Sequence, residues 1–267
     1  MRTALTIAGS DSGAGAGIQA DLKTFSSHGV YGTTAITAVT AQNTRGVTMV
    51  EATPADLVIA QIEAVASDIG VHAVKTGMLP NAAIVEAVAA TVQELDLPFL
   101  VVDPVMLAKS GDALADDEAV AAMRTELLRL AFVVTPNLPE AEALAGLPIT
   151  SDGDRREAAR RIHALGPTAV IVKGGHDRSA GIVDLLFDGR AFTEFPTERV
   201  PGAHTHGTGC TYAAALTAHL ALGRSLAEAI PLVQRYIAGA IRHAPQLGHG
   251  HGPMNHFWER GIRSSRL

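Results

Sequence analysis

Short apolar runs rich in β-branched residues alternate along the chain with segments bounded by helix start and stop signals. Such runs predict strands covered on both faces, as in a parallel sheet. Strands are expected at residues 3–8, 32–41, 47–52, 71–76, 99–105, 131–135 and 169–173. Helices are expected at residues 18–27, 54–69, 82–95, 116–130, 152–165 and 212–222, and from the capping box of Ser225 and Glu228 onward.

The last expected strands are joined differently. Asp188-Gly189 separates the runs 182–187 and 191–195, and this dipeptide favours a tight hairpin. Strands and helices otherwise alternate without a long linker or an internal repeat. The pattern predicts one α/β domain over residues 1–267: a doubly wound, mostly parallel sheet with helices on both faces and a late antiparallel hairpin.

Polar residues gather where the expected strands end. They are Gly9-Ser10-Asp11, Gln42-Asn43, Gly77, Asp103, Asn137 and Lys173-Gly174-Gly175. In a doubly wound sheet the carboxyl ends of the strands share one edge, and ligands bind there. We therefore expect a composite site built from several segments.

Two glycine-rich stretches precede helices. His206-Gly207-Thr208-Gly209-Cys210-Thr211 opens an almost purely apolar helix, and the unpaired N–H groups of such a terminus favour phosphate. The earlier stretch, residues 9–17, follows the first strand. It lacks the Gly-Lys-Ser/Thr of a P-loop, but residues 15–20 fit the dinucleotide pattern G-x-G-x-x-A. That alternative is weakened because no acidic residue lies between Asp21 and Glu51.

Composition excludes several classes of protein. The net charge is −6 and the 21 basic residues form no run, which argues against nucleic-acid binding. Apolar runs are too short for a membrane span, and the start of the chain does not read as a signal peptide. Cys210 is the one cysteine, so an intrachain disulfide is impossible. A soluble, cytoplasmic protein without membrane or nucleic-acid partners is expected.

These motifs together resemble the hydroxymethylpyrimidine/phosphomethylpyrimidine kinases of the ribokinase-like superfamily. The resemblance covers nearly the whole chain and rests on the order and spacing of Ala8-Gly9-Ser10-Asp11, residues 15–24, Ala41-Gln42-Asn43-Thr44, Gly77-Met78-Leu79, Asp103-Pro104-Val105-Met106, Lys109-Ser110-Gly111, residues 135–141, Lys173-Gly174-Gly175-His176 and residues 206–211. One small departure is Gly13-Ala14, where members of the family usually carry Ser or Gly.

The resemblance implies that ATP and Mg²⁺ are used to phosphorylate 4-amino-5-hydroxymethyl-2-methylpyrimidine and then its monophosphate, in thiamine biosynthesis. It implies catalytic roles for Gly207, Thr208, Gly209, Cys210 and Lys173. It places Gln42 on the pyrimidine, with Gly9, Asp21, Met78 and Val105 lining the pocket. Asn137, Lys173 and Thr208 would contact the nucleotide, and Glu140 and Asp103 would lie at Mg²⁺. A homodimer is also implied.

Cys210 carries a separate hypothesis. Related sugar kinases have an aspartate there as general base, whereas a cysteine at a helix N-terminus has a lowered pKa and can still remain neutral near phosphate. A phosphate monoester needs little base and would be repelled by a fixed carboxylate. We therefore expect the cysteine to favour the second phosphorylation.

Three alternatives stay open at this point. A pyridoxal/pyridoxine kinase of the same superfamily shares the Gly-x-Gly-Cys loop, but Gln42 sides with the pyrimidine, because the vitamin B6 branch carries Met-Asp there. A dinucleotide oxidoreductase would bind a nicotinamide cofactor, and a catalytically silent protein would bind the pyrimidine without consuming ATP. The segment 108–112 is the candidate flap over the substrate.

Overall fold

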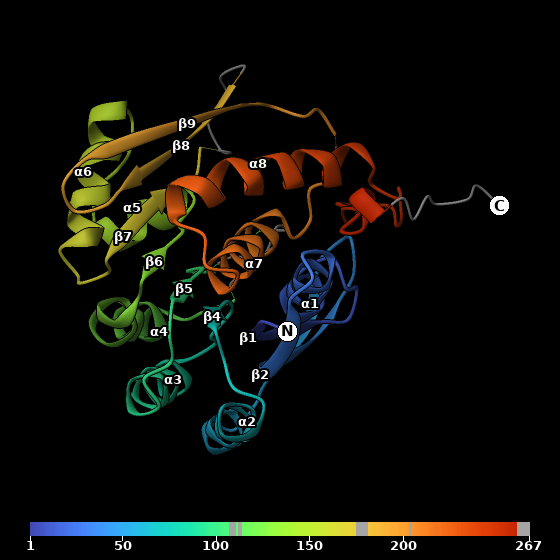
Figure 1. Ribbon diagram of the computed structural model, residues 1–267, viewed down its shortest axis with the longest axis vertical. Helices are drawn as coiled ribbons and strands as arrows, with labels where there is room; N and C mark the ends of the chain where they lie inside the picture. The colour runs from blue at the N-terminus through green and yellow to red at the C-terminus, as the bar shows by residue number, and fades with distance from the viewer. Residues whose placement is uncertain (107–110, 112–113, 175–180, 203, 261–267) are drawn as a thin grey trace.

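The computed structural model describes residues 1–106, 111, 114–174, 181–202 and 204–260, and within them nine strands form one sheet in the order β3-β2-β1-β4-β5-β6-β7-β8-β9 (Figure 1). The central strands run parallel: β2 (Tyr31–Gln42), β1 (Thr3–Asp11), β4 (Ala73–Thr76), β5 (Leu100–Val102), β6 (Val133–Val134) and β7 (Ala169–Val172). Antiparallel strands form the two margins: β3 (Val47–Ala52) on one side, β8 (Gly181–Phe187) and β9 (Phe192–Glu198) on the other.

Helices cover both faces of the sheet (Figure 1). One face carries α2 (Ala55–Asp68), α3 (Ala82–Glu94), α4 (Asp117–Ala122), α5 (Leu138–Ala145) and α6 (Asp152–His163). The opposite face carries α1 (Gly17–Ser27), α7 (Thr208–Ala221) and α8 (Leu226–Arg242). A short 3₁₀ helix, η3 (Trp258–Arg260), lies beside α8. The expected doubly wound, mostly parallel architecture is confirmed.

The sheet separates two apolar cores. In β5, Leu100 and Val102 pack into the core on the α2–α6 face, whereas Val101 packs into the core beneath α7 and α8. Successive residues of a strand point to opposite faces, so a strand covered on both sides must be apolar at every position. This double coverage explains the continuous apolar runs in the sequence.

The expected helix at 116–130 has a more complex form. The chain remains helical, but after α4 it passes through a π-helical segment, η1 (Met123–Leu127), and a 3₁₀ segment, η2 (Leu128–Leu130). The whole of α5 was absent from the expected elements. With eight residues and a proline in its first turn, it has too little periodic pattern to stand out in the sequence.

The late hairpin is confirmed. The side chain of Asp188 accepts the backbone N–H groups of Arg190 and Ala191, and Gly189 takes a positive φ of 85°. The connection joins β8 to β9 in antiparallel register. None of the described helices combines the length and the apolar character that crossing a bilayer requires.

The order of the strands also fixes where a ligand can bind. The chain moves from β1 outward to β2 on one side, and later continues from β4 onward on the other side of β1. Such a reversal leaves a crevice beside the carboxyl ends of the strands.

Candidate active site

A cavity of about 710 Å³ lies at this edge of the sheet. Residues at or just after the ends of β1, β2, β4, β5, β6 and β7 line it, as do residues at the start of α7. Of the residues singled out in the sequence, the lining includes Gly9, Gln42, Met78, Asp103, Val105, Asn137, Glu140, Lys173, Gly207, Thr208, Gly209 and Cys210. Segments from Ala8, near the start of the chain, to Ile241, near its end, thus meet in one cavity.

Asp21 differs from this expectation. The resemblance implied that it lines the pyrimidine pocket, but its side chain is fully buried and is not among the lining residues of the cavity, which include its partner Lys75. Asp21 Oδ2 lies 2.8 Å from Lys75 Nζ and accepts the hydroxyl of Thr6 at 2.7 Å. Burial alone would lower the pKa of Lys75, but the charge of Asp21, together with the hydrogen bond to it and smaller contributions from neighbours such as Asp103, outweighs burial and raises that pKa. The pair therefore places an ammonium group at the cavity floor.

The loop expected to bind an anion, residues 207–210 and called the anion-binding loop below, contains the first turn of α7. Gly207 has φ +78°, and a Cβ atom at this position would collide with the carbonyl oxygen of Gly15. Only glycine combines this conformation with such a close approach. The Thr208 hydroxyl donates to the Thr205 carbonyl at 2.7 Å. The first N–H groups of the helix have no partner within it, so this turn can hold an anion.

The Cys210 thiol, at the same turn, is half-buried. Burial raises its pKa to about 11; the charge of Lys75 opposes this rise, and the carboxylates of Asp103 and Asp21 add to it. The expected lowering of this pKa by the helix terminus is therefore wrong, because desolvation and two nearby carboxylates outweigh the helix dipole. The group is a neutral thiol at pH 7.

A cluster of three charged side chains lies beside this loop. Lys173 Nζ is 3.1 Å from Asp103 Oδ1, and a Cβ atom on Gly209 would lie 3.5 Å from the same Nζ. Glu140 and Asn137 form the capping box of α5, in which each side chain accepts the other's backbone N–H. Burial raises the pKa of Glu140 to about 7; Lys173 opposes the rise, and Asp103 adds to it. Desolvation is therefore the main obstacle to ionising Glu140.

The donor set fits the expected Mg²⁺. Asp103 is 1% exposed, and its Oδ2 is a buried oxygen without a hydrogen-bond partner in the described part of the chain. A cation there would satisfy this oxygen and lower the pKa of Glu140. The described residues contain no group of three or more His, Cys, Asp or Glu side chains arranged for a metal ion. Mg²⁺ would therefore take its other ligands from water and phosphate, as it commonly does.

The two ends of the cavity differ in character. At one end, Gln42 lies with Met78 and Val105, and a Cβ atom on Gly9 would come within 3.0 Å of Met78 Sδ, so glycine keeps this wall thin. The other end is largely apolar. Its lining includes Val200, Pro201, Ile237, Ala238 and Ile241. Residues of the anion-binding loop and of the charged cluster line the same cavity.

Sequence reasoning gave no role to several lining residues. Lys75 could have been noticed as a lysine inside an apolar strand, and Asp11 as the acid that ends β1 before the glycines. His206 was inside the quoted motif but had no assignment. The apolar end had no sequence signal, because its residues come from the segment after β9 and from one face of α8. The candidate flap at 108–112 lies outside the described residues except for Gly111.

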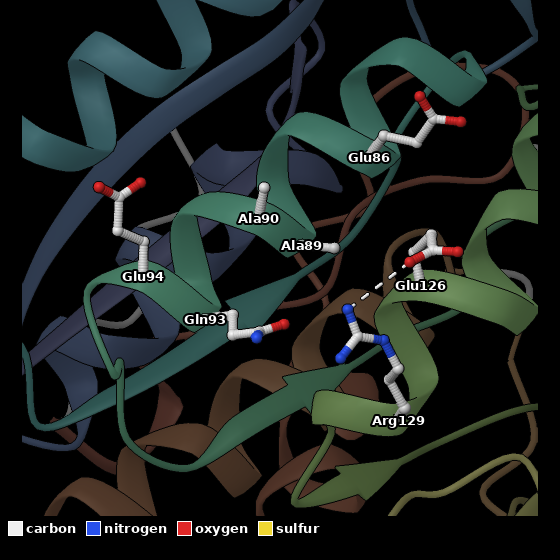
Figure 2. Close-up of a pocket in the computed structure, with 7 residues that line it drawn as sticks. All are labelled: Glu86, Ala89, Ala90, Gln93, Glu94, Glu126 and Arg129. Carbon is white, nitrogen blue, oxygen red and sulfur yellow. Dashed lines mark ion pairs between the residues drawn. The ribbon is translucent and has the colours of Figure 1, made fainter.

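Figure 2 shows a second hollow, between α3 and the segments that follow α4. Alanine side chains form part of its lining, and Glu126 and Arg129 make an exposed ion pair of 3.6 Å across one side. Exposed pairs of this kind contribute little energy. We assign this hollow no function.

Comparison with known proteins agrees with the site. The family described as Phosphomethylpyrimidine kinase matches residues 11–255. The chain is 49% identical to the hydroxymethylpyrimidine/phosphomethylpyrimidine kinase of Bacillus subtilis, over 95% of this chain and 94% of that protein. It is 53% identical to the Thiamine biosynthesis bifunctional protein ThiED of Geobacter sulfurreducens, where the match covers 95% of this chain but spans about half (52%) of that longer protein.

A solved structure shares the fold. The ADP complex of the pyridoxal kinase of Bacillus subtilis superposes with a TM-score of 0.90 at 42% identity, covering 97% of this chain and 99% of that one. Family match, close relatives and fold all converge, and the chain belongs to the phosphomethylpyrimidine kinase family.

Proposed function

We propose that this protein transfers phosphoryl groups from ATP to 4-amino-5-hydroxymethyl-2-methylpyrimidine and then to its monophosphate, in thiamine biosynthesis. One observation carries the proposal: a single cavity joins an amide-bearing end at Gln42 to an anion-binding loop and a lysine–carboxylate cluster. Relatives that are half identical are named for this activity.

The pyrimidine belongs at the Gln42 end. The ring is flat and apolar on its faces, which suits Met78 and Val105, and its edge carries a ring nitrogen and an amino group. A primary amide offers one acceptor and one donor side by side, and so can match that edge with two hydrogen bonds. Gly9 leaves room for the ring to approach the backbone of β1.

Phosphoryl transfer depends on positioning and charge stabilisation, because the transition state is loose and its charge spreads over the equatorial oxygens. Unpaired backbone N–H groups at the start of α7 would receive that charge, and the ammonium groups of Lys173 and Lys75 line the same cavity. When bound at Asp103 and Glu140, Mg²⁺ would neutralise phosphate charge. Asn137 fixes Glu140 through the capping box.

The neutral Cys210 thiol suits the second step. The monophosphate approaches the anion-binding loop as an anion, and a thiol adds no negative charge there. Asp103 already holds its carboxylate beside Lys173, so a further carboxylate at position 210 would be the group least compatible with an anionic acceptor.

ATP would place its base at the apolar end of the cavity. Pro201, Ile237 and Ile241 offer apolar surface for a flat aromatic ring, and Thr208 and Lys173 line the same cavity, where they would contact the phosphates. The ADP complex of the related pyridoxal kinase supports a nucleotide as the phosphoryl donor.

Pyridoxal or pyridoxine is the second candidate substrate. Its supporting observation is the close likeness to the pyridoxal kinase of Bacillus subtilis. The amide of Gln42 favours the aminopyrimidine, because pyridoxal has a phenolic oxygen and no adjacent amino group with which to match both amide atoms.

The open margin of the sheet supports the expected homodimer. β3 pairs with β2 on one side only, and Val39 and Met49 on these strands are 55% and 67% exposed. A second copy that covered this margin would bury apolar side chains and satisfy an edge strand. We also propose that residues 1–267 act as one domain and that the cytoplasm, which keeps thiols reduced, is the working compartment.

Phosphorus NMR tests the proposed function. Purified protein with MgATP is given the hydroxymethylpyrimidine, its monophosphate or pyridoxal in separate reactions. We expect a monophosphate resonance from the first and a diphosphate resonance from the second. Turnover of pyridoxal alone would assign the protein to vitamin B6 metabolism. If none of the three compounds led to consumption of ATP, the kinase assignment would be overturned.

A further inference from the structure

A buried hydrogen-bonded pair, His206 and Asp11, lies beside the amide of Gln42. His206 Nε2 is 2.9 Å from Asp11 Oδ2, with side-chain exposures of 9% and 3%, and the same Nε2 is 3.3 Å from the amide of Gln42. His206 immediately precedes the anion-binding loop, and Asp11 is the last residue of β1. The pair therefore connects the pyrimidine end of the cavity with the phosphate end.

Asp11 is present as a carboxylate. Its oxygens accept three backbone N–H groups of the following loop, those of Gly13, Gly15 and Ala16, at 2.8 to 3.0 Å. Burial alone would raise the pKa of Asp11, but the hydrogen bonds with His206 and this loop outweigh it and lower the pKa. An ionised carboxylate only accepts hydrogen bonds, so the proton between the two side chains belongs to His206 Nε2.

This proton determines how the Gln42 amide is oriented. The oxygen and nitrogen of a glutamine amide have nearly the same shape, and the surrounding hydrogen bonds decide their positions. The structure places the amide nitrogen of Gln42 3.3 Å from His206 Nε2, so that two donors oppose each other, and turning the amide over removes this conflict. With the amide turned over, its oxygen shares the Nε2–H group of His206 with Asp11 Oδ2.

Thr40 imposes the same orientation independently. Its hydroxyl lies 3.0 Å from the Ser10 carbonyl oxygen and 3.2 Å from the atom that the structure places as the Gln42 amide oxygen, Oε1, although the hydroxyl has only one proton to donate. The carbonyl can only accept, so the single hydroxyl proton goes to Ser10. The amide atom beside Thr40 must then donate to the hydroxyl oxygen, which makes it the nitrogen.

The backbone of His206 is held in place from behind. Its N–H donates to the carbonyl of Gly252 at 3.2 Å. In turn, the backbone N–H groups of His251 and Gly250 donate to Thr44, two residues after Gln42, at 2.8 and 3.2 Å. One C-terminal loop thus fixes the distance between His206 and the end of β2.

We infer that Asp11 and His206 are positioning residues that hold the Gln42 amide in one orientation and thereby make the enzyme select a 4-aminopyrimidine over the corresponding 4-oxopyrimidine. An aminopyrimidine presents an N–H donor beside a ring-nitrogen acceptor, whereas the oxo form presents the reverse. An amide free to turn over could bind either edge. Held by His206 and Thr40, it matches only the amino form. The inference rests on the proposed function.

The test compares two substrates in three proteins. Wild type, His206→Leu and His206→Gln are assayed with MgATP and either 4-amino-5-hydroxymethyl-2-methylpyrimidine or its 4-oxo analogue. Glutamine retains an N–H donor near the position of Nε2, whereas leucine removes it. We expect His206→Leu to lower the amino-to-oxo ratio of kcat/KM by at least about tenfold, mainly through a higher KM for the amino substrate, because the lost contact exists before the transition state. His206→Gln should stay within about threefold of the wild-type ratio.

Two controls separate this effect from damage to the fold. His249→Leu changes an exposed histidine in the same C-terminal loop, whose contact with Thr44 is made by its backbone, and should leave the ratio unchanged. Thermal unfolding of each variant checks that the proteins are folded. Equal losses for both substrates in His206→Leu would mean that His206 only supports the anion-binding loop, and would overturn the inference alone. If wild type phosphorylated neither pyrimidine, the proposed function would fall and this inference with it.

Discussion

The buried pair of Lys75 and Asp21 gives the sharpest stability prediction. Both side chains are 0% exposed and their charged atoms are 2.8 Å apart. Lys75→Met keeps the length of the side chain but leaves the carboxylate of Asp21 buried, with the Thr6 hydroxyl as its remaining described partner. Removing one partner of a buried ion pair typically costs about 3–5 kcal/mol. That loss is a large share of the free energy of unfolding of an ordinary domain, about 5–15 kcal/mol.

Equilibrium urea unfolding measures this loss. For a chain of this size the free energy of unfolding falls by about 3 kcal/mol per molar urea, so we expect the midpoint of Lys75→Met to drop by about 1–2 M. Far-UV circular dichroism and the fluorescence of Trp258, the one tryptophan of the chain, provide two signals. Coincidence of the two transitions would support two-state analysis.

The double variant Asp21→Asn/Lys75→Met is the matched control. It removes both charges and keeps similar volumes, so no uncompensated charge remains and the loss should be well below that of Lys75→Met alone. A midpoint shift below about 0.3 M for Lys75→Met would refute this reasoning. So would a double variant whose loss equals the sum of the two single losses, because the pair would then not interact.

Four further predictions concern catalysis, assembly and pH. Cys210→Asp should reduce phosphorylation of the monophosphate at least about tenfold more than phosphorylation of the alcohol, because a fixed carboxylate repels the anion by about 1 kcal/mol or more at 4 Å. Equal losses in steady-state assays of both steps would contradict this prediction. Asp103→Asn should raise the Mg²⁺ concentration needed for half-maximal activity and lower kcat about 100-fold, and an unchanged Mg²⁺ titration would exclude Asp103 from the cation site. Met49→Glu should convert a dimer to a monomer in light scattering, and no change in mass would move the interface elsewhere. Burial lowers the pKa of His256 to about 4 and of His219 to about 3, from 6.5. Between pH 6.5 and about 4 the unfolded chain therefore binds more protons than the folded one, and the free energy of unfolding should fall as pH falls, by about 1.4 kcal/mol per pH unit for each histidine. A plot of the urea midpoint against pH should be flatter for His256→Gln than for wild type, and an unchanged slope would show that this histidine is not the titrating group.

The sequence by itself determined the architecture, because the fold depends on patterns that are local in the chain. Double coverage of the sheet requires apolar residues at successive strand positions such as 100–102, and the Asp188-Gly189 turn requires a residue that tolerates positive φ. The motif at Gly207 was visible for the same reason, since its left-handed conformation demands glycine. The short helix α5, the changes of helical geometry after α4 and the 3₁₀ helix η3 were not predicted, because their patterns extend over too few residues.

Only the tertiary structure decided which charges meet. Asp21 and Lys75 are 54 positions apart in the sequence, and Asp11 and His206 are 195 positions apart. No local sequence pattern predicts either contact. Burial then reversed one inference from local structure: a cysteine at a helix N-terminus suggested a lowered pKa, whereas desolvation and the carboxylates of Asp103 and Asp21 raise it. Electrostatic energies depend on the surroundings of each group in space, and those surroundings exist only once the distant segments of the chain have packed together.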